Sequence, residues 1–194
     1  FHVTLFELDI DVSGAAASGM ERYLGSVAAT VAELVERQDA EVTFISTCQG
    51  NDDYWTDDAA TADAVVARLP VSARARGAGG RAARRPEPPR GALARGGLSL
   101  AARMHGAILA LTAGVPVVAI AYEEKTSDLF DGLGFTDYLH QIESVEAPAL
   151  TRSCRQALAR TETLRQQVAA RGASLRASAY SAAARLQGVM ETAR

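Results

Sequence analysis

The sequence predicts an α/β domain with a Rossmann-like parallel sheet flanked by helices. Two short and almost wholly apolar runs, 98–102 and 115–121, are typical of strands buried on both faces, because a half-exposed strand would alternate apolar and polar residues. Between them, residues 107–112 favour a helix, and Gly114 stands where a helix C-terminal glycine belongs. Parallel strands need a crossover connection, so this segment predicts a β–α–β unit.

The amino-terminal part of the chain predicts further elements of the same kind. Residues 3–10 are strand-like, and residues 20–37 carry apolar side chains at helical spacing along one face. Residues 41–47 are rich in β-branched residues and predict another strand, and residues 59–69 predict a helix. Together these elements extend the predicted sheet and its helical cover.

The carboxyl-terminal part predicts mostly helix. Residues 129–135 indicate a short helix and a turn, and His140 is expected at the surface. A long helix rich in alanine and arginine is predicted to begin at Pro148, break at Gly172 and resume to about Thr192. Its apolar stripe is expected to pack against the sheet or a neighbouring domain.

Residues 73–97 depart from this pattern. They are nearly all alanine, arginine, glycine and proline, with seven arginines and Glu87 as the single acid. Pro86, Pro88 and Pro89 exclude a continuous helix or a central strand. The favoured interpretation is a disordered linker within the domain. A basic arm for nucleic acid or an anionic membrane, and a GC-rich gene segment translated out of frame, are the alternatives.

Composition limits the function classes. The 194 residues, 48% hydrophobic with a formal charge of −3, suit a single α/β domain. Without the arginine-rich segment the chain is clearly acidic, so it is not expected to bind nucleic acid. Cys48 and Cys154 lack metal-ligand spacing, and neither a signal peptide nor a membrane-spanning run is present, so a cytoplasmic protein is expected.

Polar clusters follow both strands of the predicted β–α–β unit. Arg103, His105 and Gly106 follow the first strand, and Glu123 and Lys125 follow the second. Because parallel strands end at one edge of a sheet, these clusters are expected to face the same crevice. A helix N-terminus attracts anions, arginine offers two parallel donors to a carboxylate or phosphate, and histidine transfers protons near neutral pH. The arrangement predicts a site for a small anion.

Each of these residues also has an ordinary structural interpretation. His105 can cap or pack a helix, Arg103 can pair with a nearby glutamate, and Lys125, the only lysine of the chain, can be a solvated charge. Gln49 follows the strand predicted at 41–47 and is a candidate substrate contact, with an ordinary loop as the alternative. No metal site is predicted.

The motif residues resemble the polysaccharide pyruvyl transferase family. That family typically shows an Arg-Leu-His-Gly turn, an apolar helix, a Gly-x-Pro strand and a Tyr-x-x-Lys ending. The corresponding segments of this chain are RMHGAILA at 103–110, GVPV at 114–117 and YEEK at 122–125. Met104 replaces the usual leucine and preserves its bulk.

The resemblance implies the carboxyl-terminal half of a two-domain, glycosyltransferase-B-like enzyme, whose amino-terminal, acceptor-binding domain would lie outside this chain. Such an enzyme transfers pyruvate from phosphoenolpyruvate, without a further cofactor, onto a sugar of a bacterial cell-surface polysaccharide or its precursor. Arg103 would bind the carboxylate or phosphate, and His105 would act as general acid or base. Lys125 would hold the phosphate and Glu123 would orient it or accept a hydroxyl proton, while Gly106 and Gln49 are further expected substrate contacts.

Two other functions fit the residues. A nucleotide-sugar glycosyltransferase of the same architecture would place a diphosphate at the same helix end, although no glutamate-bearing, glycine-rich donor motif follows the turn. A non-catalytic remnant, kept as a binding or inert module, is the other alternative.

Overall fold

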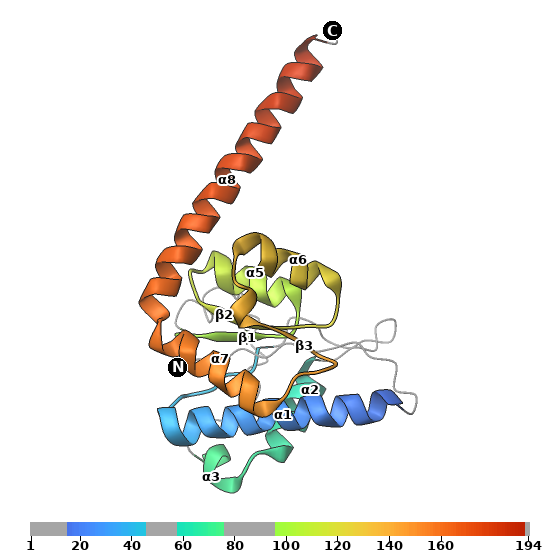
Figure 1. Ribbon diagram of the computed structural model, residues 1–194, viewed down its shortest axis with the longest axis vertical. Helices are drawn as coiled ribbons and strands as arrows, with labels where there is room; N and C mark the ends of the chain where they lie inside the picture. The colour runs from blue at the N-terminus through green and yellow to red at the C-terminus, as the bar shows by residue number, and fades with distance from the viewer. Residues whose placement is uncertain (1–14, 46–57, 76–95, 193–194) are drawn as a thin grey trace.

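A small parallel sheet forms the centre of the molecule. The computed structural model describes residues 15–45, 58–75 and 96–192 (Figure 1). The sheet has the order β1–β2–β3, and both pairings are parallel. Its strands are β1 (Ser99–Ala101), β2 (Val117–Ala121) and β3 (Leu139–Gln141). Every residue of β1 and β2 is buried, which explains why these two runs lack polar alternation.

The predicted crossover between the first two strands is confirmed. Helix α5 (Met104–Thr112) connects β1 to β2, and Gly114 follows it with a φ of 75°. The amide of Val115 donates to the carbonyl of Ala110 at 2.9 Å, which closes the helix end. The helix begins at Met104, three residues earlier than predicted, so His105 and Gly106 lie inside its first turn.

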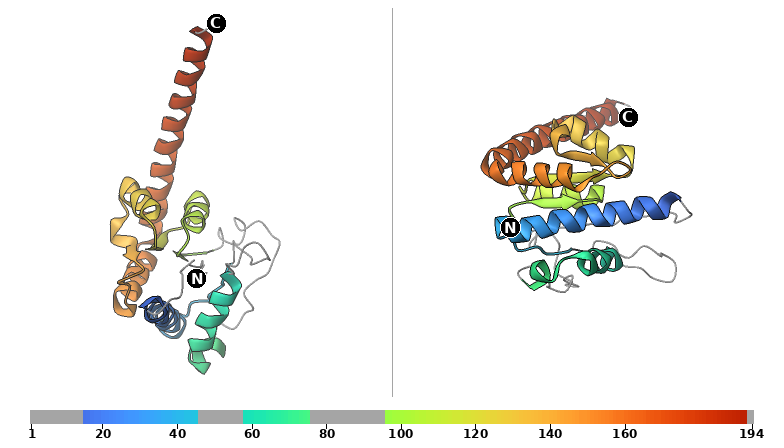
Figure 2. Two further views of the ribbon diagram at one scale, coloured as in Figure 1. Left: turned by 90° about the vertical axis from the view of Figure 1, so that its right-hand side faces the viewer. Right: turned by 60° about the horizontal axis from the view of Figure 1, so that its bottom comes forward.

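Helices cover both faces of the sheet. Helix α5 and helix α6 (Glu124–Leu133) lie on one face, and helix α7 (Ala147–Ala159) lies on the other (Figure 1). Helix α1 (Ala15–Gln38) packs between α7 and helix α2 (Asp58–Arg68) (Figure 2). The helices predicted at 20–37 and 59–69 are thereby confirmed.

Buried hydroxyl groups hold α1 against α7. The hydroxyls of Thr30 and Thr151 share a hydrogen bond of 3.0 Å, and the hydroxyl of Ser26 donates to the carbonyl of Val145 at 3.2 Å. Around these contacts the predicted apolar face of α1 is buried. The polar pairs therefore specify one alignment of two helices whose apolar contacts alone would tolerate sliding.

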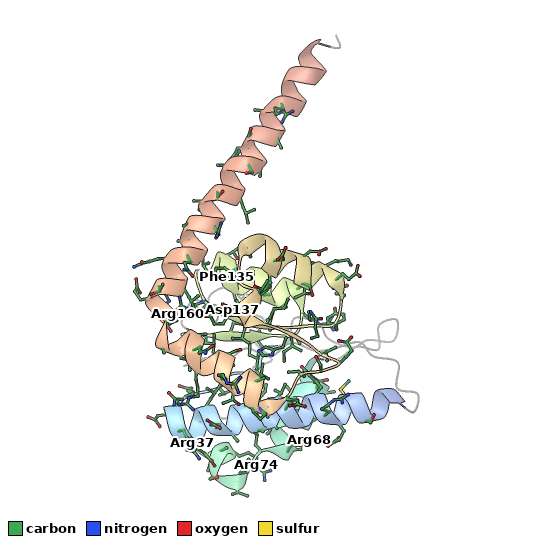
Figure 3. All side chains as sticks on the ribbon, in the orientation of Figure 1. Arg37, Arg68, Arg74, Phe135, Asp137 and Arg160 are labelled. Carbon is green, nitrogen blue, oxygen red and sulfur yellow. The ribbon has the colours of Figure 1, made fainter. Side chains whose placement is uncertain are left out.

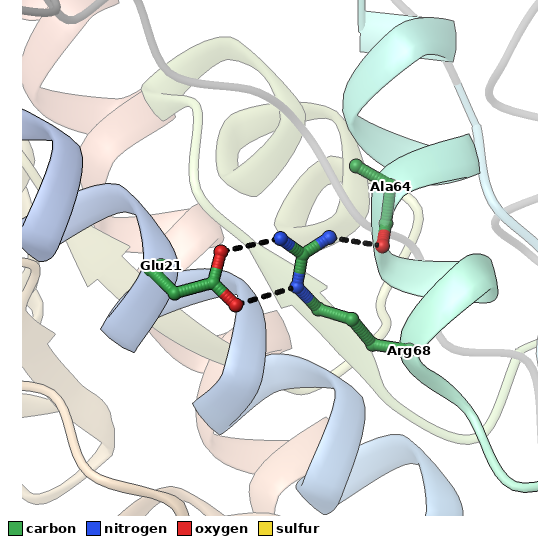
Figure 4. A network of polar contacts seen from close by, with 3 residues as sticks. All are labelled: Glu21, Ala64 and Arg68. Atoms are coloured by element: carbon green, nitrogen blue, oxygen red, sulfur yellow. Dashed lines mark hydrogen bonds and ion pairs between the residues drawn. The ribbon is translucent and has the colours of Figure 1, made fainter.

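An exposed arginine joins α1 to α2. The guanidinium of Arg68 donates to both carboxylate oxygens of Glu21, and its Nη1 donates to the carbonyl of Ala64 at 2.8 Å (Figure 4). The hydrogen bonds lower the pKa of Glu21 and raise the pKa of Arg68. Because the pair is solvated, it serves mainly to orient α2.

The strand predicted at 41–47 is wrong in the part that the structure describes, because residues 41–45 form no strand. Residues 46–47 lie outside the described residues, as does the whole strand predicted at 3–10. Val42, Phe44 and Ile45 are nevertheless buried in the core. The apolar pattern thus predicted the burial of these side chains correctly. A segment can bury its side chains without pairing with a neighbouring strand.

The predicted break of the long carboxyl-terminal helix is also wrong. The break falls at Arg160, and helix α8 (Thr161–Thr192) then passes through Gly172 without interruption. The Arg160 amide donates to the carbonyls of Gln156 and Ala157, which closes α7. Glycine inside a helix costs only about 1 kcal/mol relative to alanine, so Gly172 need not end it.

The arginine-rich segment is described only at its ends. Residues 76–95 lie outside the described residues, so the predicted linker is untested there. Ala73, however, is fully buried in the short helix α3 (Val71–Ala73), and the carbonyl of Gly96 accepts a hydrogen bond of 3.2 Å from Arg165. These ends are therefore part of the packed structure.

His140 is half-buried on β3, contrary to the surface position predicted for it. Its Nε2 lies 3.0 Å from the hydroxyl of Ser153 on α7. Burial lowers the pKa of His140 below its ordinary value of 6.5, because the charged imidazolium is poorly solvated between β3 and α7.

None of the described helices is both long enough and sufficiently apolar to cross a membrane.

We expect the replacement Thr30→Val to destabilise the fold by about 1–3 kcal/mol, because it leaves the Thr151 hydroxyl buried without its partner. The double variant Thr30→Val/Thr151→Val removes both polar groups and should approach the stability of the original chain. Urea unfolding of the three proteins measures this. Equal losses in the single and double variants would contradict the role given to the hydrogen bond.

Alanine at Gly114 and at Gly25 should have opposite effects. Neither position has an atom within 4 Å of an added Cβ, so only the backbone conformation differs. Gly114→Ala is expected to cost about 1–2 kcal/mol because its φ is left-handed. Gly25→Ala, within α1, should stabilise by about 0.5–1 kcal/mol. Thermal unfolding of both variants checks the two signs.

The free energy of unfolding should fall as the pH drops below 6.5. Below that value the unfolded chain binds a proton at residue 140 more readily than the folded chain does, so protonation favours unfolding. Urea unfolding between pH 5 and 7.5 should therefore show a slope that His140→Asn flattens. If the slope is the same in that variant, the pH dependence does not come from His140.

Candidate functional site

The three strands end at one edge of the sheet. Ala101, the last residue of β1, pairs with Ala119, and β2 continues to Ala121, which pairs with Gln141 at the end of β3. The residues that follow β1 and β2 therefore leave the sheet side by side. The predicted meeting of the two polar clusters at this edge follows from that register.

Arg103 is the N-cap residue of α5. Its backbone is extended, with φ −99° and ψ 136°, and its carbonyl accepts the first hydrogen bond of the helix from Ala107 at 3.0 Å. The side chain is half-buried, and its Nη2 atom is buried. Burial of the Nη2 atom leaves the guanidinium little freedom to reorient.

His105 and Gly106 lie in the first turn of α5, not in a turn before the helix. His105 is exposed, whereas Gly106 is buried. The first turn of a helix has backbone N–H groups without intrahelical partners, and these carry partial positive charge. The exposed imidazole therefore stands at an end of the helix that favours an anion.

The second cluster forms the start of α6. Glu123 is its N-cap residue, Glu124 and Lys125 are its first two helical residues, and β2 ends at Ala121, as predicted. The Nζ of Lys125 lies 3.3 Å from a carboxylate oxygen of Glu123. The lysine is 72% exposed and the glutamate 32% exposed, so a solvated pair of this kind costs little to separate.

Both helix starts thus meet the same sheet edge. The structure brings Arg103 and His105 to the end of β1, and Glu123 and Lys125 to the end of the adjacent β2. Gln49 lies outside the described residues. Within the described ranges, no cluster of histidine, cysteine and acidic residues has the arrangement of a metal site.

Sequence analysis missed a third group at this edge. Gln141 ends β3, and its Nε2 donates to the hydroxyl of Ser127 on α6 at 3.0 Å. Thr126, also in the first turns of α6, is fully buried, and its hydroxyl has no hydrogen-bond partner among the described residues. The three-residue β3 is too short to give a recognisable sequence pattern, which is why these residues carried no signal.

Comparison with protein families identifies the chain. The family model described as "Polysaccharide pyruvyl transferase" matches residues 12–124, more than half of the chain. No curated protein matches. Among solved structures, the chain is similar to one titled "Crystal Structure Analysis of the Glycotransferase of kitacinnamycin" at 13% identity and a TM-score of 0.42, covering 93% of this chain and 42% of that chain. The chain thus spans less than half of that structure, and a TM-score this low supports no conclusion about fold or function. The matched residues include β1, α5 and β2 with the Arg103–His105 turn, and the chain belongs to the polysaccharide pyruvyl transferase family.

Proposed function

We propose that this chain binds phosphoenolpyruvate at the edge formed by the ends of β1 and β2, and transfers its pyruvyl group to a saccharide. The observation that carries the proposal is the Arg103–His105 turn at the start of α5, in a chain of this family. The acceptor is proposed to be a sugar of a cell-surface polysaccharide or its precursor.

The site suits the charge of the donor. Phosphoenolpyruvate carries a carboxylate and a phosphate on a three-carbon unit. Arg103 supplies two parallel N–H donors for one of these groups, and the first amides of α5 add partial positive charge. Lys125, released from Glu123, supplies a mobile cation for the phosphate.

Ketal formation requires several proton transfers. A proton is added to the methylene carbon of phosphoenolpyruvate, which gives its central carbon positive character. One sugar hydroxyl attacks that carbon and loses its proton, phosphate departs, and a second hydroxyl closes the ketal with loss of another proton. His105 is proposed as the general acid or base, and Glu123 as the acceptor of a hydroxyl proton.

The proposed enzyme is larger than this domain. A glycosyltransferase-B-like arrangement would place a second domain, which binds the acceptor, across the edge where the three strands end. Gln141 and Ser127 extend that edge along α6 and are available to the acceptor side. A cytoplasmic location is proposed because that compartment supplies phosphoenolpyruvate.

Replacement of Arg103 by alanine should weaken donor binding. We expect phosphoenolpyruvate, titrated into the ¹⁵N-labelled chain, to shift NMR signals from the first turn of α5. Loss of a charge-assisted hydrogen bond of about 1.5–3 kcal/mol weakens binding roughly 10- to 100-fold. Arg103→Lys keeps the positive charge but loses the two parallel donors of the guanidinium. Its affinity should lie between those of the original chain and Arg103→Ala.

The controls separate binding from folding. Circular dichroism must show that the Arg103 variants keep the fold, because the Nη2 atom is buried. Arg152→Ala, an exposed arginine on α7, should leave binding unchanged. If the original chain is well folded and does not bind phosphoenolpyruvate, the proposed donor site is refuted. Binding of a nucleotide sugar instead would indicate a glycosyltransferase.

A further inference from the structure

An apolar groove lies between α5, α6 and α8. Its volume is about 510 Å³, which is usual for a site that binds a small molecule. Apolar side chains line it from all three helices, and Phe135, which follows α6, adds to this lining (Figure 3). The others include Ile108 and Leu111 from α5, Leu129 and Leu133 from α6, and Leu175 from α8. The groove is therefore suited to an aliphatic chain.

The charge at the groove is positive. Among the described residues that line it, Arg171 and Arg176 of α8 are the only charged ones, and both are exposed. One guanidinium nitrogen of Arg171 lies 3.4 Å from the position that a Cβ on Gly134 would take. Neither guanidinium forms an ion pair or a hydrogen bond with the part of the chain that the structure describes. Both positive charges are therefore available to a ligand.

The neighbouring helix ends offset part of this charge. The carboxyl-terminal end of a helix carries about half a negative charge. Helix α5 ends at the groove, where Ala113 and Gly114 line it, and Gly134, the C-cap residue of α6, lies beside Arg171. Two guanidiniums and two helix ends leave a net charge of about +1. A single carboxylate balances that charge, and its two oxygens match the parallel donors of an arginine.

Gly172 leaves space open on the α8 wall of the groove. Glycine is less favourable than alanine inside a helix, so this residue does not serve the stability of α8. A Cβ added to it would meet one side-chain atom within 4 Å, a guanidinium nitrogen of Arg176 at 3.6 Å. The open space is thus bounded by an arginine and by the apolar lining. A carboxylate with an aliphatic tail matches both boundaries.

We propose that this groove binds the anion of a single-chain fatty acid, with its carboxylate at Arg171 and Arg176 and its tail along the apolar walls. The groove lies at the opposite ends of α5 and α6 from the edge where phosphoenolpyruvate is proposed to bind. Binding of the fatty acid uses no residue of that edge. The inference therefore does not depend on the proposed pyruvyl transfer.

Isothermal titration calorimetry with dodecanoate, kept below its micelle concentration, tests the class of ligand. One molecule should bind per chain. Decanoate, which is two carbons shorter, should bind roughly tenfold more weakly because it buries less apolar surface. Dodecyltrimethylammonium has the same tail and a positive head, and it should also bind roughly tenfold more weakly or worse. Absence of dodecanoate binding, or equal affinity for the cation, overturns the proposal. Tighter binding of dodecyl phosphate overturns the choice of a carboxylate.

Two variants and a matched control test the location. Gly172→Leu fills space on the groove wall and favours the helix, so it should weaken dodecanoate binding roughly tenfold or more without loss of thermal stability. Arg171→Gln/Arg176→Gln should weaken binding by a similar factor, because it removes both charged donors. Arg185→Gln replaces an exposed arginine of α8 outside the groove and should leave the affinity unchanged. Circular dichroism checks the fold of each variant. Unchanged affinity in either test variant, or an equal loss in Arg185→Gln, refutes the site.

Discussion

Burial of the sheet on both faces is the constraint on which the rest of the structure depends. All residues of β1 and β2 are buried, so the chain must supply a helix layer on each side of the sheet, which has three strands among the described residues. Helices α5 and α6 provide one layer, and α7, backed by α1, provides the other. The charged residues that follow β1 and β2 lie at the strand ends, and the Arg103–His105 turn lies at that edge.

Helix α7 joins the sheet to the amino-terminal helices through polar contacts. It pairs the hydroxyls of Thr151 and Thr30 with α1, and Ser153 contacts His140 on β3. Each of these groups is wholly or partly withdrawn from water and would be costly to bury alone. Their mutual hydrogen bonds therefore fix the position of α7, which in turn supports the sheet from the side opposite α5.

The same geometry gives α5 and α6 two roles. Their first turns lie at the sheet edge, where Arg103 and Glu123 are the N-cap residues. Their carboxyl-terminal ends line an apolar groove of about 510 Å³ together with α8. The proposed donor site and this groove therefore lie at opposite ends of the same two helices.

The sequence by itself determined the β–α–β unit, because two buried strands and a glycine-ended helix leave a pattern within a few residues of one another. It also determined the family, since the Arg103–His105 motif is local. Tertiary structure alone decided whether residues 41–45 join the sheet, because burial and strand pairing produce the same apolar pattern. It alone decided that the long helix breaks at Arg160, and it alone brought Gln141 beside Ser127. Whether residues 41–45 pair with a strand, and whether Gln141 contacts Ser127, depends on residues distant in the sequence, so no local pattern predicts either outcome.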